Sequence, residues 1–309
     1  MLIQRIHQEY RRLWDANAPL TATAVIMLAA FIGSVAGLFI DPRIITGVPA
    51  WLKPAKFGIS TAIYAASIAW LLRYITVWPR FTRAMGWVLA MVLNTEVGII
   101  DLQAARGTTS HFNYSTPLDA ALFGVMAVAI AILWLANVGL VVALFRQHFD
   151  DTGWGWALRL GLSITVLGAS VGGIMVQPTA KQLENTRPTI IGAHTVGGPD
   201  GGPGLPGVGW STEHGDLRIA HFVGLHALQV IPFLAWFLRR RHSSSSAVAF
   251  AVAGSYLALA GILAWQALRG EPITAPQPAT LAAFAIWLAG TAAGLIATLA
   301  RLGRAEALA

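Results

Sequence analysis

The chain has 309 residues, of which 56% are hydrophobic and only 11% are charged. It contains no cysteine, which excludes disulfide bonds, thiolate metal sites and cysteine nucleophiles. Its 21 Lys and Arg outnumber its 14 Asp and Glu, but they form no basic stripe, so we exclude a nucleic-acid partner.

The N-terminal segment alternates apolar and basic residues at helical spacing, in the sequence MLIQRIHQEYRRLWDAN. We predict that residues 1–18 form an amphipathic segment along the cytoplasmic headgroups of a lipid bilayer. A membrane domain is expected over residues 19–302, and a short cytoplasmic tail over residues 303–309.

Eight mostly apolar runs of about twenty residues follow, and each can cross a hydrocarbon core of about 30 Å. The expected spans cover residues 20–40, 57–77, 83–104, 118–145, 155–177, 216–238, 246–268 and 278–300. The sequence therefore predicts an all-α, polytopic membrane protein with eight transmembrane helices.

An internal repeat groups these spans. GIIDLQAARG at 98–107 and GILAWQALRG at 261–270 share Gly, Ile, Gln, Ala, Arg and Gly in register, and a looser copy covers 171–181. Because each copy ends at a polar turn before another apolar run, we expect four tandem helical hairpins.

Lys and Arg are divided unevenly between the two sets of connections. Thirteen of the 21 fall in the N-terminal segment, the tail and the connections on the same side. The positive-inside rule then puts both termini in the cytoplasm, with the chain in a bacterial-type inner membrane.

One connection is much longer than the others. Residues 177–215 include the Gly-rich run HTVGGPDGGPGLPGVGW and lie on the extracytoplasmic side. Loops of this length are commonly functional or mobile. A flexible surface strap and a folded lid over a ligand both fit the sequence.

Ionisable residues inside a membrane are costly and are candidates for function. Glu96 lies well inside the third span, where we expect it to be protonated or paired with a cation such as Lys56 or Arg106. A proton-handling role and a buried ion pair that fixes helix packing both remain open. Asp119 and Asp216 are expected to cap helix N-termini.

Five of the eight histidines fall on the extracytoplasmic side: His111, His194, His214, His221 and His226. Alignment of the repeats puts His221 and Lys56 at equivalent positions, so we expect both to face a central pocket. His226 is a further cofactor-binding candidate, although on an unbroken helix it lies about 140° round from His221 and is not expected to share a metal with it.

The stretch GLP at 204–206, followed by DLRIAHF at 216–222, resembles the second-half loop and ligand helix of haem A synthase. That resemblance implies eight spans in two four-helix halves, with axial histidines on the second helix of each hairpin. His221 stands where one such ligand is expected, while Lys56, Leu122 and Ala283 occupy the other three positions.

We therefore expect a redox-related membrane protein that binds a haem, a transition metal or a quinone near His221 and Lys56, with proton or anion handling by Glu96 and Arg106. Two alternatives remain. A transporter or channel would use the repeats and the intramembrane charges, although no unwound mid-membrane segment is evident. A metal-assisted hydrolase or lipid-modifying enzyme would use His111, His214 and His221.

Overall fold

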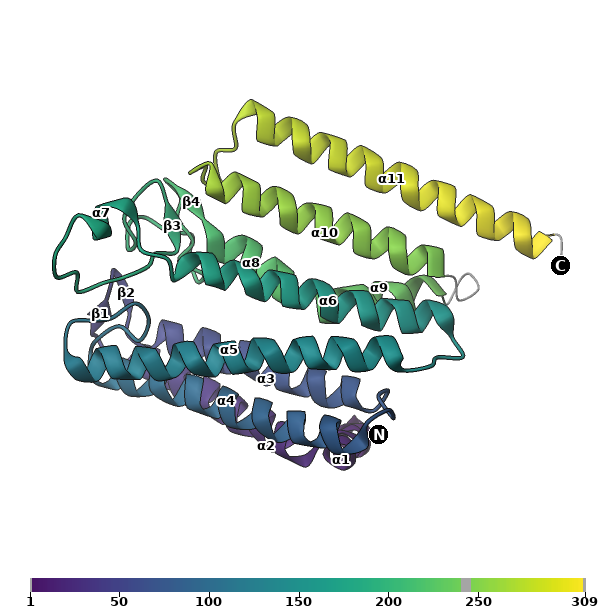
Figure 1. Ribbon diagram of the computed structural model, residues 1–309, viewed down its shortest axis with the longest axis horizontal. Coiled ribbons are helices and arrows are strands. Elements are labelled where there is room, and N and C mark those ends of the chain that lie inside the picture. The colour runs from purple at the N-terminus through teal and green to yellow at the C-terminus, as the bar shows by residue number, and fades with distance from the viewer. Residues whose placement is uncertain (1, 240–245, 308–309) are drawn as a thin grey trace. The chain divides into compact units, whose positions relative to one another are not determined.

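The computed structural model describes residues 2–239 and 246–307 (Figure 1). The expected cytoplasmic connection near 239–246 and the end of the expected tail include residues 240–245 and 308–309, which lie outside this range. Over the described residues the chain is mainly α-helical, with two pairs of two-residue strands. The all-α prediction is confirmed.

The chain forms two compact units. Unit 1 comprises Met1–Ala143 and Pro178–Gly192, and unit 2 comprises Leu144–Gln177 and Ala193–Ala309. The long connection is thus shared between the units instead of forming one segment.

Unit 1 is a bundle of long helices with an N-terminal helix beside it. Its elements are α1 (Leu2–Ala16), α2 (Ala18–Ile40), β1 (Ile44–Ile45), β2 (Val48–Pro49), α3 (Leu52–Leu72), α4 (Pro79–Ala105), most of α5 (Pro117–Arg146) and the single turn α7 (Ala180–Leu183). The strands β1 and β2 pair as a small antiparallel hairpin between α2 and α3. Helix α1 exposes Ile6, Tyr10 and Trp14 on one side, as an amphipathic helix does, and its place among headgroups stays a prediction.

Unit 2 is also made of long helices, and one of them is broken. Its elements are α6 (Thr152–Met175), β3 (Thr195–Val196), β4 (Gly215–Asp216), α8 (Leu217–Leu225), α9 (Ala227–Arg239), α10 (Ser246–Leu268) and α11 (Pro278–Ala307). Figure 1 shows α10 and α11 side by side as a hairpin. Strands β3 and β4 pair antiparallel and tie the Gly-rich part of the long connection to the start of α8.

Among the described residues, seven helices are long and apolar enough to cross a membrane, and the bent pair α8–α9 makes an eighth if it is one span. This agrees with a multi-pass membrane protein. The second span runs over Leu52–Leu72, not 57–77. Pro54 falls in its first turn, where a missing N–H costs nothing because those groups have no partner within the helix.

The sixth span is broken, contrary to the expectation of an unbroken helix, and α8 meets α9 at 48°. Thr165 of α6 bridges the break, because its Oγ1 accepts the N–H of Leu228 at 3.0 Å and lies 3.3 Å from the carbonyl of Leu225. Pro232 lies within α9 and offers no N–H to the preceding turn. At the break, the backbone groups of Leu225 and Leu228 thus find a partner on a neighbouring helix, which a membrane interior favours.

The two clearest sequence repeats form the same helix end. At the end of α4, the N–H of Thr108 bonds the carbonyl of Gln103 at 3.0 Å, and Gly107 adopts φ +76°. At the end of α10, the N–H of Glu271 bonds the carbonyl of Gln266 at 3.2 Å, and Gly270 adopts φ +73°. Each glycine takes the left-handed conformation that closes this type of helix end.

Candidate functional site

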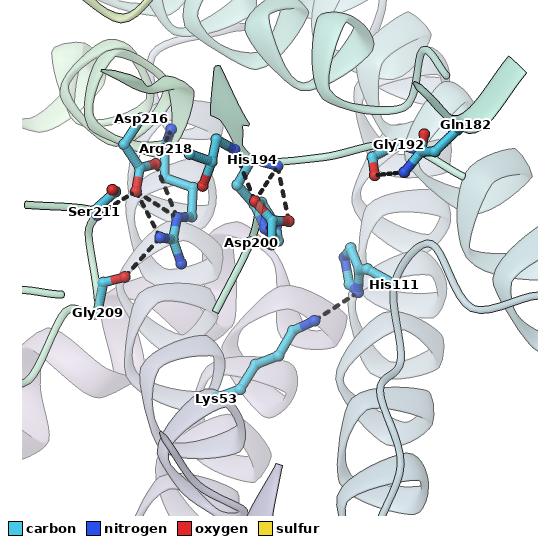
Figure 2. A network of polar contacts seen from close by, with 11 residues as sticks. Lys53, His111, Gln182, Gly192, His194, Asp200, Gly209, Ser211, Asp216 and Arg218 are labelled. Atoms are coloured by element: carbon cyan, nitrogen blue, oxygen red, sulfur yellow. Dashed lines mark hydrogen bonds and ion pairs between the residues drawn. The ribbon is translucent and has the colours of Figure 1, made fainter. Parts of the chain in front are cut away.

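His111 is the centre of a polar cluster in unit 1. It belongs to the α4–α5 connection, whereas Lys53 lies in the first turn of α3 and Glu96 in α4. The Nζ of Lys53 is 3.1 Å from His111 Nδ1, as Figure 2 shows. His111 Nε2 is 3.5 Å from Glu96 Oε1. The three side chains therefore form a line of contacts from a helix start into a membrane span.

These contacts determine the tautomer of neutral His111. A charged lysine can only donate, so Nδ1 must accept from Lys53 and the ring hydrogen must sit on Nε2, toward Glu96. The hydroxyl of Ser110 lies 3.0 Å from the same Nδ1. The imidazole thus joins a cation to a carboxylate through its two nitrogens.

Aromatic rings surround this imidazole. Its ring centroid lies 5.8 Å from Phe57, 6.1 Å from Phe112 and 6.3 Å from Phe123. Phe112 has φ 62°, a left-handed conformation that is uncommon for an aromatic residue and often occurs at functional sites. The cluster is therefore enclosed on several sides by apolar ring surfaces.

The first part of the long connection, residues 178–192, holds the α4–α5 loop that contains His111 in place. The N–H of Tyr114 bonds the carbonyl of Thr189 at 2.8 Å, and the N–H of Ile191 bonds the carbonyl of Phe112 at 3.0 Å. The segment is itself folded, since α7 has a capping box between Thr179 and Gln182. It behaves as a folded strap over the loop.

Glu96 faces the interior of unit 1 and is only 5% exposed. Its Oε2 has no hydrogen-bond partner among the described residues. The cation that acts electrostatically on it is Lys53. The sequence predicts Lys56 or Arg106 as a partner. Lys56 lies part-buried in the second turn of α3, and its role stays a prediction.

Arg106 serves a different carboxylate, so pairing with Glu96 is corrected. Its guanidinium is 2.7 Å from Asp119 Oδ1 and also bonds Gln103, whose amide donates to Asp119 at 2.9 Å. Asp119 in turn accepts from the hydroxyl of Thr116 at 2.6 Å in the first turn of α5. The capping residue of α5 is instead Thr116, whose Oγ1 accepts the N–H of Asp119 at 3.1 Å. Asp119 lies inside the first turn, so its expected capping role is corrected to an acidic first-turn residue that binds Arg106.

The fourth hairpin contains the counterpart of this network. Arg269 bonds Glu271, which accepts the hydroxyl of Thr280 at 2.6 Å in the first turn of α11. Gln266 is 2% exposed and donates to the carbonyl of Pro272 at 3.0 Å. The Gln and Arg shared by the two repeats are thus structural residues that join one helix end to the next helix start.

His221 lies part-buried on α8 in unit 2, and its Nδ1 is 2.9 Å from the carbonyl oxygen of Gly168 on α6. A carbonyl only accepts, so Nδ1 carries hydrogen and Nε2 keeps its lone pair. An imidazole held in this way is suited to ligate a metal through Nε2. Gly168 also packs directly against Gly224, where a Cβ on either residue would overlap the other's backbone.

The other candidate residues are spread over both units. His226 is the C-cap of α8, at the break, with its ring 4.3 Å from that of Phe222. His214 lies beside Gly198 in unit 2. Because Lys56 and His111 belong to unit 1, a pocket shared with His221 stays a prediction. Within the described ranges no group of three or more His, Cys, Asp or Glu is placed to hold a metal ion.

Figure 2 shows two ion pairs of unit 2, one in the second part of the long connection (residues 193–215) and one at the start of α8. Asp216 caps α8 and pairs with Arg218 at 2.6 Å, which confirms its predicted role. Asp200 accepts from Nδ1 of His194 at 3.0 Å and from the N–H of Thr195 at 2.8 Å. Burial works against the charged carboxylate, but the bonds from His194 and Thr195 outweigh it and lower the pKa of Asp200.

Lys53 and Ser110 were missed as site residues. The repeat alignment favoured Lys56, because it compares positions along helices. It does not predict which helix residue the α4–α5 loop, with His111, will contact. The available signal was the pair Ser110–His111 in a short connection next to a span that contains Glu96.

Comparison with known proteins identifies no relative: no protein-family model, no curated protein and no solved structure matches the chain.

Proposed function

We propose that this integral membrane protein binds a quinone-type redox ligand at the Lys53–His111–Glu96 cluster and exchanges protons with it. The observation that carries the proposal is the line of contacts in which His111 lies 3.1 Å from Lys53 and 3.5 Å from Glu96. A cation, an imidazole and a buried carboxyl in contact are the components of acid–base chemistry.

The chemistry of each member supports this function. Lys53 and Ser110 can donate hydrogen bonds to a quinone carbonyl, and Phe57 and Phe123 offer ring faces for an apolar ring. A proton can move through His111 without charging it. As Lys53 gives a proton to Nδ1, the hydrogen on Nε2 passes to Glu96, which leaves a neutral amine, the other imidazole tautomer and a protonated carboxyl.

The test is ligand binding by the purified full chain in lipid nanodiscs, titrated with a short-tailed quinone analogue at several pH values. We expect binding whose affinity depends on pH. Glu96→Gln should weaken it at least about tenfold and remove the pH dependence. Asp101→Asn removes another carboxyl of α4 that lies outside the cluster, and it should leave the affinity within about twofold.

The contrary result is equally specific. A wild-type chain that binds no quinone analogue, but drives a solute flux in proteoliposomes that Glu96→Gln abolishes, would be a transporter. The broken sixth span gives that outcome a structural basis, because discontinuous helices are common in transporters.

A second candidate concerns unit 2, where the tautomer of His221 fits a haem or transition-metal ligand. One imidazole whose Nε2 lone pair points away from its hydrogen bond to Gly168 can supply one axial bond, and the bound group would supply the redox chemistry. Absorption spectra and metal analysis of the purified chain test this. Pigment or metal that is lost in His221→Ala supports the assignment, whereas a colourless, metal-free wild-type chain contradicts it.

The proposed setting is a bacterial inner membrane with both termini in the cytoplasm. Because the chain has no cysteine, single cysteines can report its orientation directly. A cysteine in place of Thr46 should react with an impermeant thiol reagent from outside, and one in place of Gln147 should react only after the membrane is opened. The reverse pattern would invert the proposed topology.

A further inference from the structure

A second polar pair lies inside unit 1 and has no part in the proposed ligand chemistry. The hydroxyl of Tyr64 on α3 donates to Oδ1 of Asn137 on α5 at 2.8 Å. Asn137 is 3% exposed, and its amide nitrogen bonds the carbonyl of Leu133 in its own helix at 2.8 Å. The amide is therefore oriented, and the Tyr64 hydroxyl oxygen keeps its lone pairs for another donor.

This pair lies on the same helix faces as the Lys53–His111–Glu96 cluster. At 100° per residue, Tyr64 projects within about 20° of Lys53 on α3. On α5, Asn137 projects within about 40° of Phe123, the residue that contacts His111. The face of α3 that carries Lys53 therefore also carries Tyr64, and the face of α5 near Phe123 also carries Asn137, further along each helix.

Packing sets the depth of the pair relative to Glu96. Ala62 of α3 packs in one cluster with Val97 of α4, so the backbone of Tyr64 lies within about one helical turn of the level of Glu96. Met126 of α5 packs against Ile99 and Ile100, which places Asn137 about 10 Å deeper than Glu96. Glu96 therefore has polar groups on both sides along the bundle axis.

We propose that Tyr64, held by Asn137, connects Glu96 to the end of unit 1 where α3 ends and α4 begins. This rests on the proposed proton exchange at Glu96. A hydroxyl passes a proton when its O–H bond breaks toward an acceptor while a new O–H bond forms with an arriving proton, so Tyr64 ends uncharged. Water is the carrier on both sides: one water delivers the arriving proton to a lone pair of the hydroxyl oxygen, and the hydroxyl turns from Asn137 to a second water that takes the released proton to Glu96. Protons for the ligand site then reach Glu96 from both ends of the unit.

The test is proton movement across proteoliposomes that contain the full chain and a trapped pH indicator, with a potassium gradient and valinomycin as the driving force. We expect wild-type flux well above that of empty liposomes, and at least a tenfold loss in Tyr64→Phe, which removes only the hydroxyl. Ser67→Ala is the matched control, since Ser67 lies one turn further along α3 and bonds the carbonyl of Ile63. It should keep the flux within about twofold.

A second readout separates this inference from the proposed function. If Glu96→Gln loses both proton flux and quinone binding while Tyr64→Phe loses only flux, the proton connection is supported. Tyr64-dependent flux in a chain that binds no quinone supports the connection and removes the ligand proposal. Wild-type flux no greater than that of empty liposomes overturns the connection, as does a Tyr64→Phe chain that conducts as well as Ser67→Ala. A merely structural role for Tyr64 would lower thermal stability without a selective loss of flux.

Discussion

The Nε2 of His111 lies 3.5 Å from the Oε1 of Glu96, although one residue belongs to a loop and the other to a membrane span. The strap of residues 178–192 holds this loop, because it bonds the backbone of Phe112 and Tyr114, which follow the imidazole in the chain. A carboxyl that would otherwise face only apolar side chains gains an imidazole and, beyond it, a cation.

The stability of Glu96 variants follows from this arrangement. Glu96→Gln removes a buried charge and keeps the side-chain shape, so we expect the free energy of unfolding to stay equal or rise by up to about 2 kcal/mol. His111→Leu leaves the carboxylate with less compensation and should lower it by about 2–4 kcal/mol. Thermal unfolding in detergent measures both. If Glu96→Gln has a lower free energy of unfolding than His111→Leu, then burial of the Glu96 charge is not what destabilises this cluster.

Arg106 should contribute to stability through Asp119 rather than through the ligand site. Arg106→Ala leaves a carboxylate that is only 4% exposed without its ion pair, and we expect a loss of about 1–3 kcal/mol. Combination with Asp119→Asn should recover part of that loss in a double-mutant cycle. Quinone binding should remain within about twofold. Strictly additive losses would contradict the pairing.

Close backbone packing at the broken span makes its glycines sensitive. Gly168→Ala places a methyl group against the backbone of Gly224, and overpacking of this kind costs about 1–3 kcal/mol or more. Gly173→Ala on the same helix meets no atom within 4 Å and is the matched control. Unfolding midpoints that fall equally in the two variants would show that α6 and α8 are further apart than described.

The second part of the long connection should loosen in acid. The pKa of Asp200 is lowered in the folded chain, so its contribution is present above the unfolded pKa of about 3.9 and is lost as pH falls through the lower folded value. Hydrogen exchange of a peptide that covers residues 193–216 should therefore quicken below about pH 4. Asp200→Asn should show fast exchange at neutral pH and little further change in acid. A loop that stays protected in acid would contradict the role of this carboxylate.

Local features were predictable from the sequence. The lengths of the apolar runs identified the helices within a few residues, since a span must cover the bilayer core whatever its neighbours are. The repeats at 98–107 and 261–270 also predicted matching ends, because a glycine in the left-handed conformation closes each helix. Asp216 was identified as a capping residue from its place just before an apolar run, whereas the cap of α5 is Thr116 and not Asp119.

Contacts between distant segments were harder to predict. The repeat alignment favoured Lys56, while the residue in contact with His111 is Lys53, which lies 58 positions before it. The break in the sixth span was missed, because Thr165, which bridges it, lies on another helix. Arg106 was one of two cations suggested as a partner of Glu96, whereas the turn of the α4–α5 connection brings it to Asp119.

The amino-acid sequence alone determined that this chain is a membrane bundle of paired helices, because hydrophobic length and turn chemistry act within a few neighbouring residues. Only the tertiary structure decided which polar side chains meet. That choice depends on the relative rotation and depth of packed helices and on the path of a returning loop, and a shift of one residue turns a side chain by 100° to a different neighbour.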